Sequence, residues 1–146
     1  MHLPPDWWKS IFNSLYLKTD GDVVENAENT FSDIEALIAV TGITPEQNLV
    51  DLCCGQGRHS MELAGRGYQH VTGIDRSRYL IRVARKRAKN SQFKVVFSEG
   101  DARKIRLPES SHDCVFLMGN SFGYFEREED DKAVLEAIKR VLKPGG

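Results

Sequence analysis

A glycine-containing segment constrains the fold of this chain more than any other feature. It reads NLVDLCCGQGR at positions 48–58 and continues as an amphipathic run to Ala64. The apolar start is typical of a buried strand, and the amphipathic run is typical of a helix. Gly55 and Gly57 allow the backbone to turn sharply and a ligand to approach it closely, and the first N–H groups of the helix would face that ligand. The segment therefore predicts the strand–loop–helix unit at which an open α/β sheet binds a nucleotide-like cofactor.

The residues that follow alternate between strand and helix patterns. Beyond the strand at 48–53 and the helix at 58–65, we expect strands at 70–75, 93–99 and 113–118 and helices at 78–90 and 128–142. Such alternation implies a mostly parallel sheet with right-handed crossovers. The side chains expected to point inward from the last two helices are Leu80, Ile81, Val83 and Ala84, then Val134, Leu135, Ile138, Val141 and Leu142.

The N-terminal third has a helical rhythm without strands. Residues 5–18 predict one amphipathic helix, and 30–40 predict a second, with an irregular polar stretch at 23–29 between them. We therefore divide the chain into an N-terminal helical cap, residues 1–47, and an α/β domain, residues 48–146. The inward side chains expected in the cap are Trp8, Ile11, Phe12, Leu15 and Tyr16, then Phe31, Ile34, Leu37 and Ile38.

Charge and cysteine content narrow the class of protein. The 146 residues carry a net charge of −1, so the overall charge does not point to nucleic acid or to an anionic membrane. No apolar run approaches the length of a membrane span. The adjacent Cys53 and Cys54, with Cys114, suit neither a C-x-x-C metal site nor a disulfide framework. We expect reduced, buried thiols, a cytoplasmic location and no bound metal.

Five short motifs occur in a characteristic order. They are VDLCCGQGR at 50–58, GID at 73–75, EGDA at 99–102, SHDCV at 111–115 and VLKPGG at 141–146. Together they resemble the class I S-adenosylmethionine-dependent methyltransferases. The resemblance implies a Rossmann-like parallel sheet flanked by helices and methyl transfer from S-adenosyl-L-methionine to a small-molecule or unidentified acceptor. Family members continue with further strands, so we expect an incomplete domain, truncated after the helix that follows the fourth strand.

The resemblance also assigns roles to the residues of the glycine loop. The acid at Asp51 would interact with the amino group of the cofactor, although its carboxylate could instead bond the N–H groups of its own loop. Cys53 stands where the family commonly has glycine. Because it carries a Cβ atom, we expect its backbone to keep a negative φ.

Two further acids follow the second and third strands. Asp75 would accept hydrogen bonds from the ribose diol of the cofactor; the alternative is a helix N-cap, a role that Ser77 could fill instead. Asp101 would lie near the adenine amino group, and the Ala102 N–H near a ring nitrogen, unless Asp101 is only an exposed turn acid. The cofactor-binding set implied by the resemblance is Asp51, Cys53, Gly55, Gly57, Asp75, Arg76, Asp101, Ala102 and Asn120.

The loop after the fourth strand would face the methyl group. There Asn120 could orient an acceptor and Tyr124 could line its pocket, while Tyr16 and Trp8 of the cap could cover the cofactor or belong to the core. Asn120, Tyr124 and Tyr16 are therefore the candidate catalytic residues. We interpret His59 as structural or cofactor-adjacent rather than as a base.

Other interpretations stay open on the sequence alone. The basic residues at 76–89 are either a solvated helix face or a surface for RNA. A nicotinamide-dependent dehydrogenase fits the glycine loop less well, because a full G-x-G-x-x-G is missing. An incomplete domain could also be a non-catalytic cofactor-binding or dimerisation module. A homodimer through the strand at 113–118 or the helix at 128–142 would cover the exposed strand edge.

Overall fold

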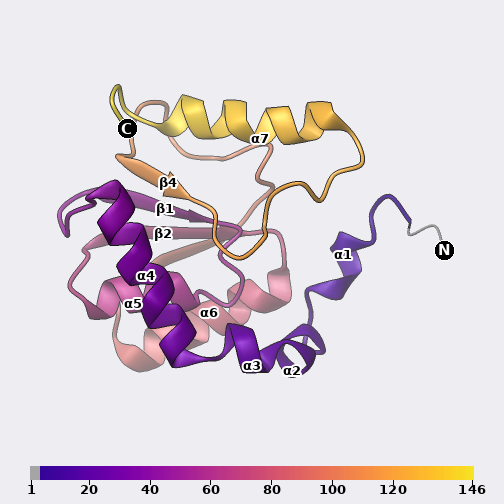
Figure 1. Ribbon diagram of the computed structural model, residues 1–146, viewed down its shortest axis with the longest axis horizontal. Helices are drawn as coiled ribbons and strands as arrows, with labels where there is room; N and C mark the ends of the chain where they lie inside the picture. The colour runs from indigo at the N-terminus through magenta and orange to yellow at the C-terminus, as the bar shows by residue number, and fades with distance from the viewer. Residues whose placement is uncertain (1–3) are drawn as a thin grey trace.

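The computed structural model describes residues 4–146, so the first three residues of the proposed cap lie outside the described part (Figure 1). One parallel sheet runs in the order β3-β2-β1-β4, which confirms the α/β fold with a parallel sheet. Its strands are β1 (Asn48–Leu52), β2 (His70–Asp75), β3 (Val96–Glu99) and β4 (Cys114–Phe116). The helices are α1 (Trp8–Ile11), α2 (Tyr16–Thr19), α3 (Gly21–Val24), α4 (Ala27–Thr41), α5 (Arg58–Gly65), α6 (Arg78–Ser91) and α7 (Glu128–Val141).

Helices cover both faces of the sheet. In Figure 1, α7 lies on one face, and α4, α5 and α6 lie on the other. Because neighbouring side chains in a strand point to opposite faces, Leu49 packs with Ile34 and Leu63 on the α4–α5 side. Val50, the next residue of β1, packs with Val134 on the α7 side. All five side chains are essentially inaccessible to solvent, so β1 is the centre of the core.

The prediction of one continuous helix over residues 5–18 is wrong. Two short helices, α1 and α2, replace it, because polar side chains compete for the backbone between them. The Asn13 side chain donates to the Ser10 carbonyl and accepts from the Leu15 N–H. Ile11 and Leu15, expected to point inward, are 42% and 62% exposed.

The stretch predicted to be irregular at 23–29 is wrong in part. It contains the end of α3 and the start of α4, where the Asn26 side chain accepts from the Glu28 and Asn29 N–H groups. Such a bond satisfies the free donors of the first helical turn. Gly42, in the left-handed region at φ 65°, ends α4.

Two further residues expected to point inward, Phe31 and Leu135, are on the surface instead. Phe31 is 54% exposed and lies under Arg66, whose guanidinium carbon is 4.5 Å from the ring centre. Leu135 is 55% exposed because Val134 and Ala137 form the buried face of α7. The third and fourth strands are also shorter than the predicted ranges 93–99 and 113–118.

The strand β4 forms one edge of the sheet. It pairs with β1 on one side, and no described residue pairs with its other side.

No helix within residues 4–146 is long and apolar enough to span a bilayer.

Candidate functional site

A cavity of about 500 Å³ lies at the carboxyl ends of the strands. In an open parallel sheet this edge collects the loops that bind ligands. The loops after all four strands contribute to its wall, and the cap helices α1, α2 and α3 close it from the other side. The volume falls within the range of roughly 300–1,000 Å³ that small-molecule sites occupy.

The glycine loop after β1 has three residues in the left-handed region: Cys53 at φ 61°, Gly55 at φ 55° and Gly57 at φ 80°. The expectation of a negative φ at Cys53 is therefore wrong. The Cys54 N–H bonds the Ile74 carbonyl of β2, and the Gly57 N–H bonds the Cys54 carbonyl. These bonds hold the turn tightly enough that Cys53 adopts a conformation normally left to glycine.

The two loop glycines have different surroundings. Gly55 lines the cavity, and a Cβ atom there would meet only Leu80, at 3.9 Å. A Cβ atom on Gly57 would lie 2.6 Å from the Phe97 ring, and Gly57 is not part of the cavity wall. Gly55 therefore leaves room for a ligand, whereas Gly57 leaves room for the core.

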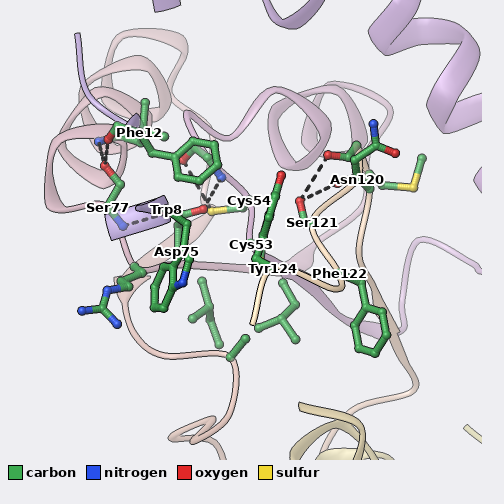
Figure 2. A pocket seen from close by; sticks show the side chains of 18 of the residues that line it. Trp8, Phe12, Cys53, Cys54, Asp75, Ser77, Asn120, Ser121, Phe122 and Tyr124 are labelled. Atoms are coloured by element: carbon green, nitrogen blue, oxygen red, sulfur yellow. Dashed lines mark hydrogen bonds between the residues drawn. The ribbon is translucent and has the colours of Figure 1, made fainter. Parts of the chain in front are cut away.

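Asp75 ends β2 and lies on the cavity wall, close to Ser77 and the glycine loop (Figure 2). Its Oδ2 accepts from the Gly55 N–H at 2.8 Å, and its Oδ1 accepts from the Ser77 N–H at 2.7 Å. Burial raises the pKa of Asp75, and these backbone N–H bonds counteract part of the rise. The N-cap of α6 is Ser77, whose Oγ accepts from the Leu80 N–H. The carboxylate of Asp75 is thus fixed by the loop while it faces the cavity.

Asp51 does not line the cavity. It points into the core from β1, is 1% exposed, and accepts from the Ser60 hydroxyl at 2.7 Å. Burial raises its pKa to about 7, against the opposing effect of the Ser60 bond. The side chain expected to meet the amino group of the cofactor therefore connects β1 to α5 in this structure.

Asp101 follows β3 and lines the cavity, but its carboxylate is bound by Arg103. The Arg103 side chain donates to Asp101 Oδ1 at 3.0 Å and to Oδ2 at 2.7 Å, and the Arg103 N–H donates to Oδ1 at 2.9 Å. These bonds lower the pKa of Asp101. The third nitrogen of the Arg103 side chain, Nη1, donates to Asp130 of α7 at 2.9 Å. Arg103 thus ties the loop after β3 to the first turn of α7.

Asp131 is a cavity residue that the sequence analysis missed. Among the described residues its Oδ1 is buried and has no hydrogen-bond partner. Its neighbour on the same helix face, Val134, was expected to point inward. The spacing of three residues between them was the signal that Asp131 also faces the cavity.

Aromatic side chains of the cap meet those of the loop after β4. The Trp7 and Phe12 rings lie 5.6 and 5.9 Å from the Tyr124 ring, and Phe12 lies 5.2 Å from Tyr16. Burial raises the pKa of both Tyr16 and Tyr124, so both hydroxyls are neutral at pH 7. The ring centres of Trp8 and Phe125 lie 5.2 Å apart, and the Arg76 guanidinium lies 4.7 Å from the centre of the Trp8 ring.

Polar bonds attach the cap to the sheet. The Ser77 hydroxyl donates to the Phe12 carbonyl at 2.6 Å, at the break between α1 and α2 (Figure 2). The Gln56 side chain donates to the Val24 carbonyl at 2.8 Å.

Asp33 of α4 accepts from Arg58 and contacts His59 Nε2, each at 2.9 Å. His59 lines the cavity, but burial lowers its pKa and the bond to Asp33 occupies Nε2. This arrangement supports a structural role for His59.

The loop after β4 begins with two residues in the left-handed region, Gly119 and Asn120, a conformation that both residue types tolerate. Asn120 has φ 57° and an exposed side chain, and the Ser121 hydroxyl donates to the Met118 carbonyl at 2.8 Å. Figure 2 shows Tyr124 between this loop and the Asp75 side of the cavity. The structure therefore brings Tyr16, Asn120 and Tyr124 to one cavity, as it does seven of the nine residues expected to bind the cofactor: Cys53, Gly55, Asp75, Arg76, Asp101, Ala102 and Asn120.

The thiols of the site are unreactive in character. Burial raises the pKa of Cys53 to about 12 and that of Cys54 well above its ordinary value, and all three cysteines are free. Within residues 4–146, no three His, Cys, Asp or Glu side chains gather as a metal site requires.

Comparison with known proteins agrees with the geometry. A family model described as a methyltransferase domain matches residues 49–146. YqeM of Bacillus subtilis is 34% identical over 70% of this chain and 41% of its own length. The demethylmenaquinone methyltransferase of Listeria welshimeri is 35% identical over 68% of this chain and 42% of its own length. The crystal structure of the PH0226 protein of Pyrococcus horikoshii superposes with a TM-score of 0.76 at 31% identity, covering 91% of this chain and 59% of that one.

These matches have two consequences. The chain spans about two fifths of the length of the curated relatives. The match of the family model covers most of the chain, and the fold and the glycine loop agree with it. The chain belongs to the class I S-adenosylmethionine-dependent methyltransferase family.

Proposed function

We propose that this chain binds S-adenosylmethionine along the carboxyl edge of the sheet and transfers its methyl group to a small-molecule acceptor. The observation that carries the proposal is the cavity itself, in which Gly55 leaves its backbone open beside the fixed Asp75 carboxylate. A carboxylate accepts hydrogen bonds only, and a ribose diol offers two donors. The residues present therefore fit the sugar of the cofactor.

The cofactor supplies an electrophilic methyl group when it is bound. The chain then has to exclude water and hold the acceptor in line with that group, which accounts for much of the rate in reactions of this kind. The cap supports this task, because Ser77 and Gln56 anchor it over the cavity through Phe12 and Val24. Tyr16, Asn120 and Tyr124 are neutral hydrogen-bonding groups at pH 7. In this proposal they orient the acceptor and do not act as strong bases.

The aromatic lining supports an acceptor that is flat or apolar. Phe12, Tyr16 and Tyr124 form an aromatic part of the cavity wall, with the Phe12 ring 5.2 Å from Tyr16 and 5.9 Å from Tyr124. The Listeria relative is named for demethylmenaquinone, so a naphthoquinol belongs in a first panel of acceptors beside small phenols and amines.

Binding is tested by calorimetry and thermal shift with S-adenosylhomocysteine. We expect a rise in melting temperature by mass action that EDTA does not reverse, and no comparable effect of NAD. Asp75→Ala should weaken binding by about 1.5–3 kcal/mol, as expected for the loss of a hydrogen bond to a charged group. Asp22→Asn, at an exposed acid of α3 outside the cavity wall, should not weaken it. The proposal would be contradicted if the folded wild-type chain showed neither binding heat nor a change in melting temperature with millimolar S-adenosylhomocysteine.

Methyl transfer needs its own assay. Labelled S-adenosylmethionine is incubated with the acceptor panel, and transfer is compared between the wild type and Tyr124→Phe. Binding of the cofactor without transfer to any acceptor would favour the alternative, a cofactor-binding or dimerisation module. An effect of NAD in place of S-adenosylhomocysteine would favour the dehydrogenase.

A further inference from the structure

We propose that Arg58 binds a carboxylate group of the ligand at the cap side of the cavity. The inference rests on the proposed function, since the same cavity would hold S-adenosylmethionine, whose methionine part ends in an amino group and a carboxylate. Asp51, the residue expected to meet that end of the cofactor, points into the core and does not line the cavity. Arg58 does line it, and it directly follows the glycine loop as the first residue of α5.

The guanidinium of Arg58 is held through one of its nitrogen atoms. Nη1 donates to the Thr30 hydroxyl at 3.0 Å and lies 2.9 Å from Asp33 Oδ2, and both partners belong to α4 of the cap. No acceptor within residues 4–146 bonds the Nε or Nη2 N–H groups. These two nitrogens share one edge of the planar guanidinium, and such an edge can bind both oxygens of a carboxylate.

The unbonded nitrogens of Arg58 are accessible to a ligand. The side chain is 15% exposed, and among the described residues the one enclosed side-chain atom without a hydrogen-bond partner belongs to Asp131. Nε and Nη2 therefore keep accessible surface, and Arg58 forms part of the cavity wall. Because α4 already fixes the guanidinium, a ligand would bind it with little further loss of side-chain freedom.

The charges around Arg58 favour a singly charged anion. Asp33 already balances part of the guanidinium charge. Two further acids, Asp20 and Asp75, lie on the same cavity wall and, like Arg58, influence the pKa of the Tyr16 hydroxyl. A phosphate dianion would be repelled by these acids, whereas an amino group next to a carboxylate would be attracted. The amino-acid end of the cofactor fits this arrangement.

The test compares two ligands that differ only in the carboxylate. S-adenosylhomocysteine and its decarboxylated analogue share the adenosine, the thioether and the amino group. Both are titrated by calorimetry into the wild type, Arg58→Gln and Arg58→Lys. Glutamine removes the charge of the side chain, and lysine keeps the charge without the planar pair of donors.

Two controls separate the guanidinium from its structural partners. Asp33→Asn weakens the contact of Arg58 with α4 but leaves the guanidinium in the cavity wall. Arg66→Gln removes another paired arginine, at the end of α5, that is not part of the cavity wall. Thermal unfolding checks that each variant is folded.

We expect the wild type to bind S-adenosylhomocysteine more tightly than its decarboxylated analogue. This preference should fall by about ten- to a hundredfold in Arg58→Gln, as expected when a hydrogen bond between charged groups is lost, and Arg58→Lys should retain part of it. The decarboxylated analogue has a net positive charge, so it should bind Arg58→Gln at least as tightly as the wild type. General damage to the site would weaken it instead. Both controls should keep the wild-type preference.

The same chemistry has a second source, an acid group on the acceptor. Benzoate and its neutral analogue benzamide are therefore titrated into the same proteins, with and without saturating S-adenosylhomocysteine. A preference for benzoate that Arg58→Gln abolishes, together with an unchanged preference for S-adenosylhomocysteine, would support the carboxylate site and assign it to the acceptor.

Other outcomes overturn the inference. Equal weakening of both members of each ligand pair in Arg58→Gln would show a structural role only, and so would an equal loss of preference in the two controls. If the wild type binds S-adenosylhomocysteine and Arg58→Gln changes neither preference, only this inference fails. If the wild type does not bind S-adenosylhomocysteine, the proposed function fails, and the benzoate titration of the ligand-free chain decides on Arg58 alone.

Discussion

At the scale of single residues, the acids of the site differ mainly in their partners. Asp75 is held by two backbone N–H groups, Asp51 by a hydroxyl, and Asp101 by a guanidinium. The sequence placed all three at the ends of strands, because an acid after an apolar run is visible in the pattern. The sequence could not show their partners. Ser60 reaches Asp51 only because α5 folds back along β1, and Arg103 reaches Asp101 only because the loop after β3 turns back on itself.

Asp51 provides a prediction of pH dependence. Its pKa in the folded protein is about 7, against an ordinary value of 3.8. Between these values the folded state holds a proton that the unfolded state has lost, so the free energy of unfolding falls as pH rises from about 4 to about 7. Asp51→Asn removes this fall. The stability of the variant relative to the wild type should therefore increase over that range, by no more than about 4 kcal/mol, and level off above pH 7.

The measurement is urea unfolding of both proteins at several pH values between 4 and 8. The difference between them isolates Asp51, because the other titrating groups are common to both. Asp22→Asn, at an exposed acid of α3, serves as the control and should show no such trend. A difference that stays constant with pH would mean that Asp51 is ionised throughout.

At the scale of elements, the glycine loop between β1 and α5 also packs directly against β3 and α6. A Cβ atom at Gly57 would lie 2.6 Å from the Phe97 ring and 3.1 Å from Ala84. Phe97 is 4% exposed and cannot withdraw. Gly57→Ala should therefore combine backbone strain with overpacking and lower the free energy of unfolding by about 2–4 kcal/mol.

Gly67 provides the matched control for this prediction. It follows α5, has φ 91°, and has no atom within 4 Å of a built Cβ. Gly67→Ala should carry the cost of backbone strain alone, about 1–2 kcal/mol. Both values come from urea unfolding at one pH. Equal destabilisation by the two substitutions would show that the Phe97 ring moves aside and that the contact between Gly57 and Phe97 is not tightly packed.

Element boundaries were predictable where the hydrophobic pattern alone determines them. The ranges 58–65 and 70–75 were predicted as the structure has them, for α5 and β2, because both elements bury a regular face. Prediction failed where a side chain bonds the backbone, as Asn13 does between α1 and α2. The same break has a use in the structure, since it leaves the Phe12 carbonyl free to accept from Ser77.

The left-handed backbone of Cys53 could not be predicted from its own chemistry. Such a φ is unfavourable for a residue with a Cβ atom, and only its position between β1 and the Cys54–Ile74 hydrogen bond explains it. The resemblance to a family that commonly has glycine at this position was the better signal. Asp131 was missed for a similar reason: four successive acids at 128–131 look like a solvated helix start until the burial of one is known.

At the scale of the whole molecule, the described part of the cap does not cover the open edge of β4. The described part of the cap packs on α5 and over the cavity (Figure 1), and none of its residues pairs with β4. The Asp113 N–H bonds the Asn48 carbonyl of β1. Because N–H groups alternate in direction along a strand, those of Cys114 and Phe116 point to the open edge. An open edge beside half-buried apolar residues favours association.

We therefore predict concentration-dependent association of this chain, measured by sedimentation velocity in reducing buffer. Cys114→Pro removes one outward N–H without affecting a bond to β1, as proline is tolerated at the open side of an edge strand, and should shift the equilibrium toward the monomer. Cys114→Ser keeps that N–H and should associate as the wild type does, which also excludes a disulfide as the cause. Far-UV circular dichroism checks that each variant is folded. A wild type that stays monomeric into the millimolar range, or a folded Cys114→Pro that associates equally, would rule out β4 as the contact.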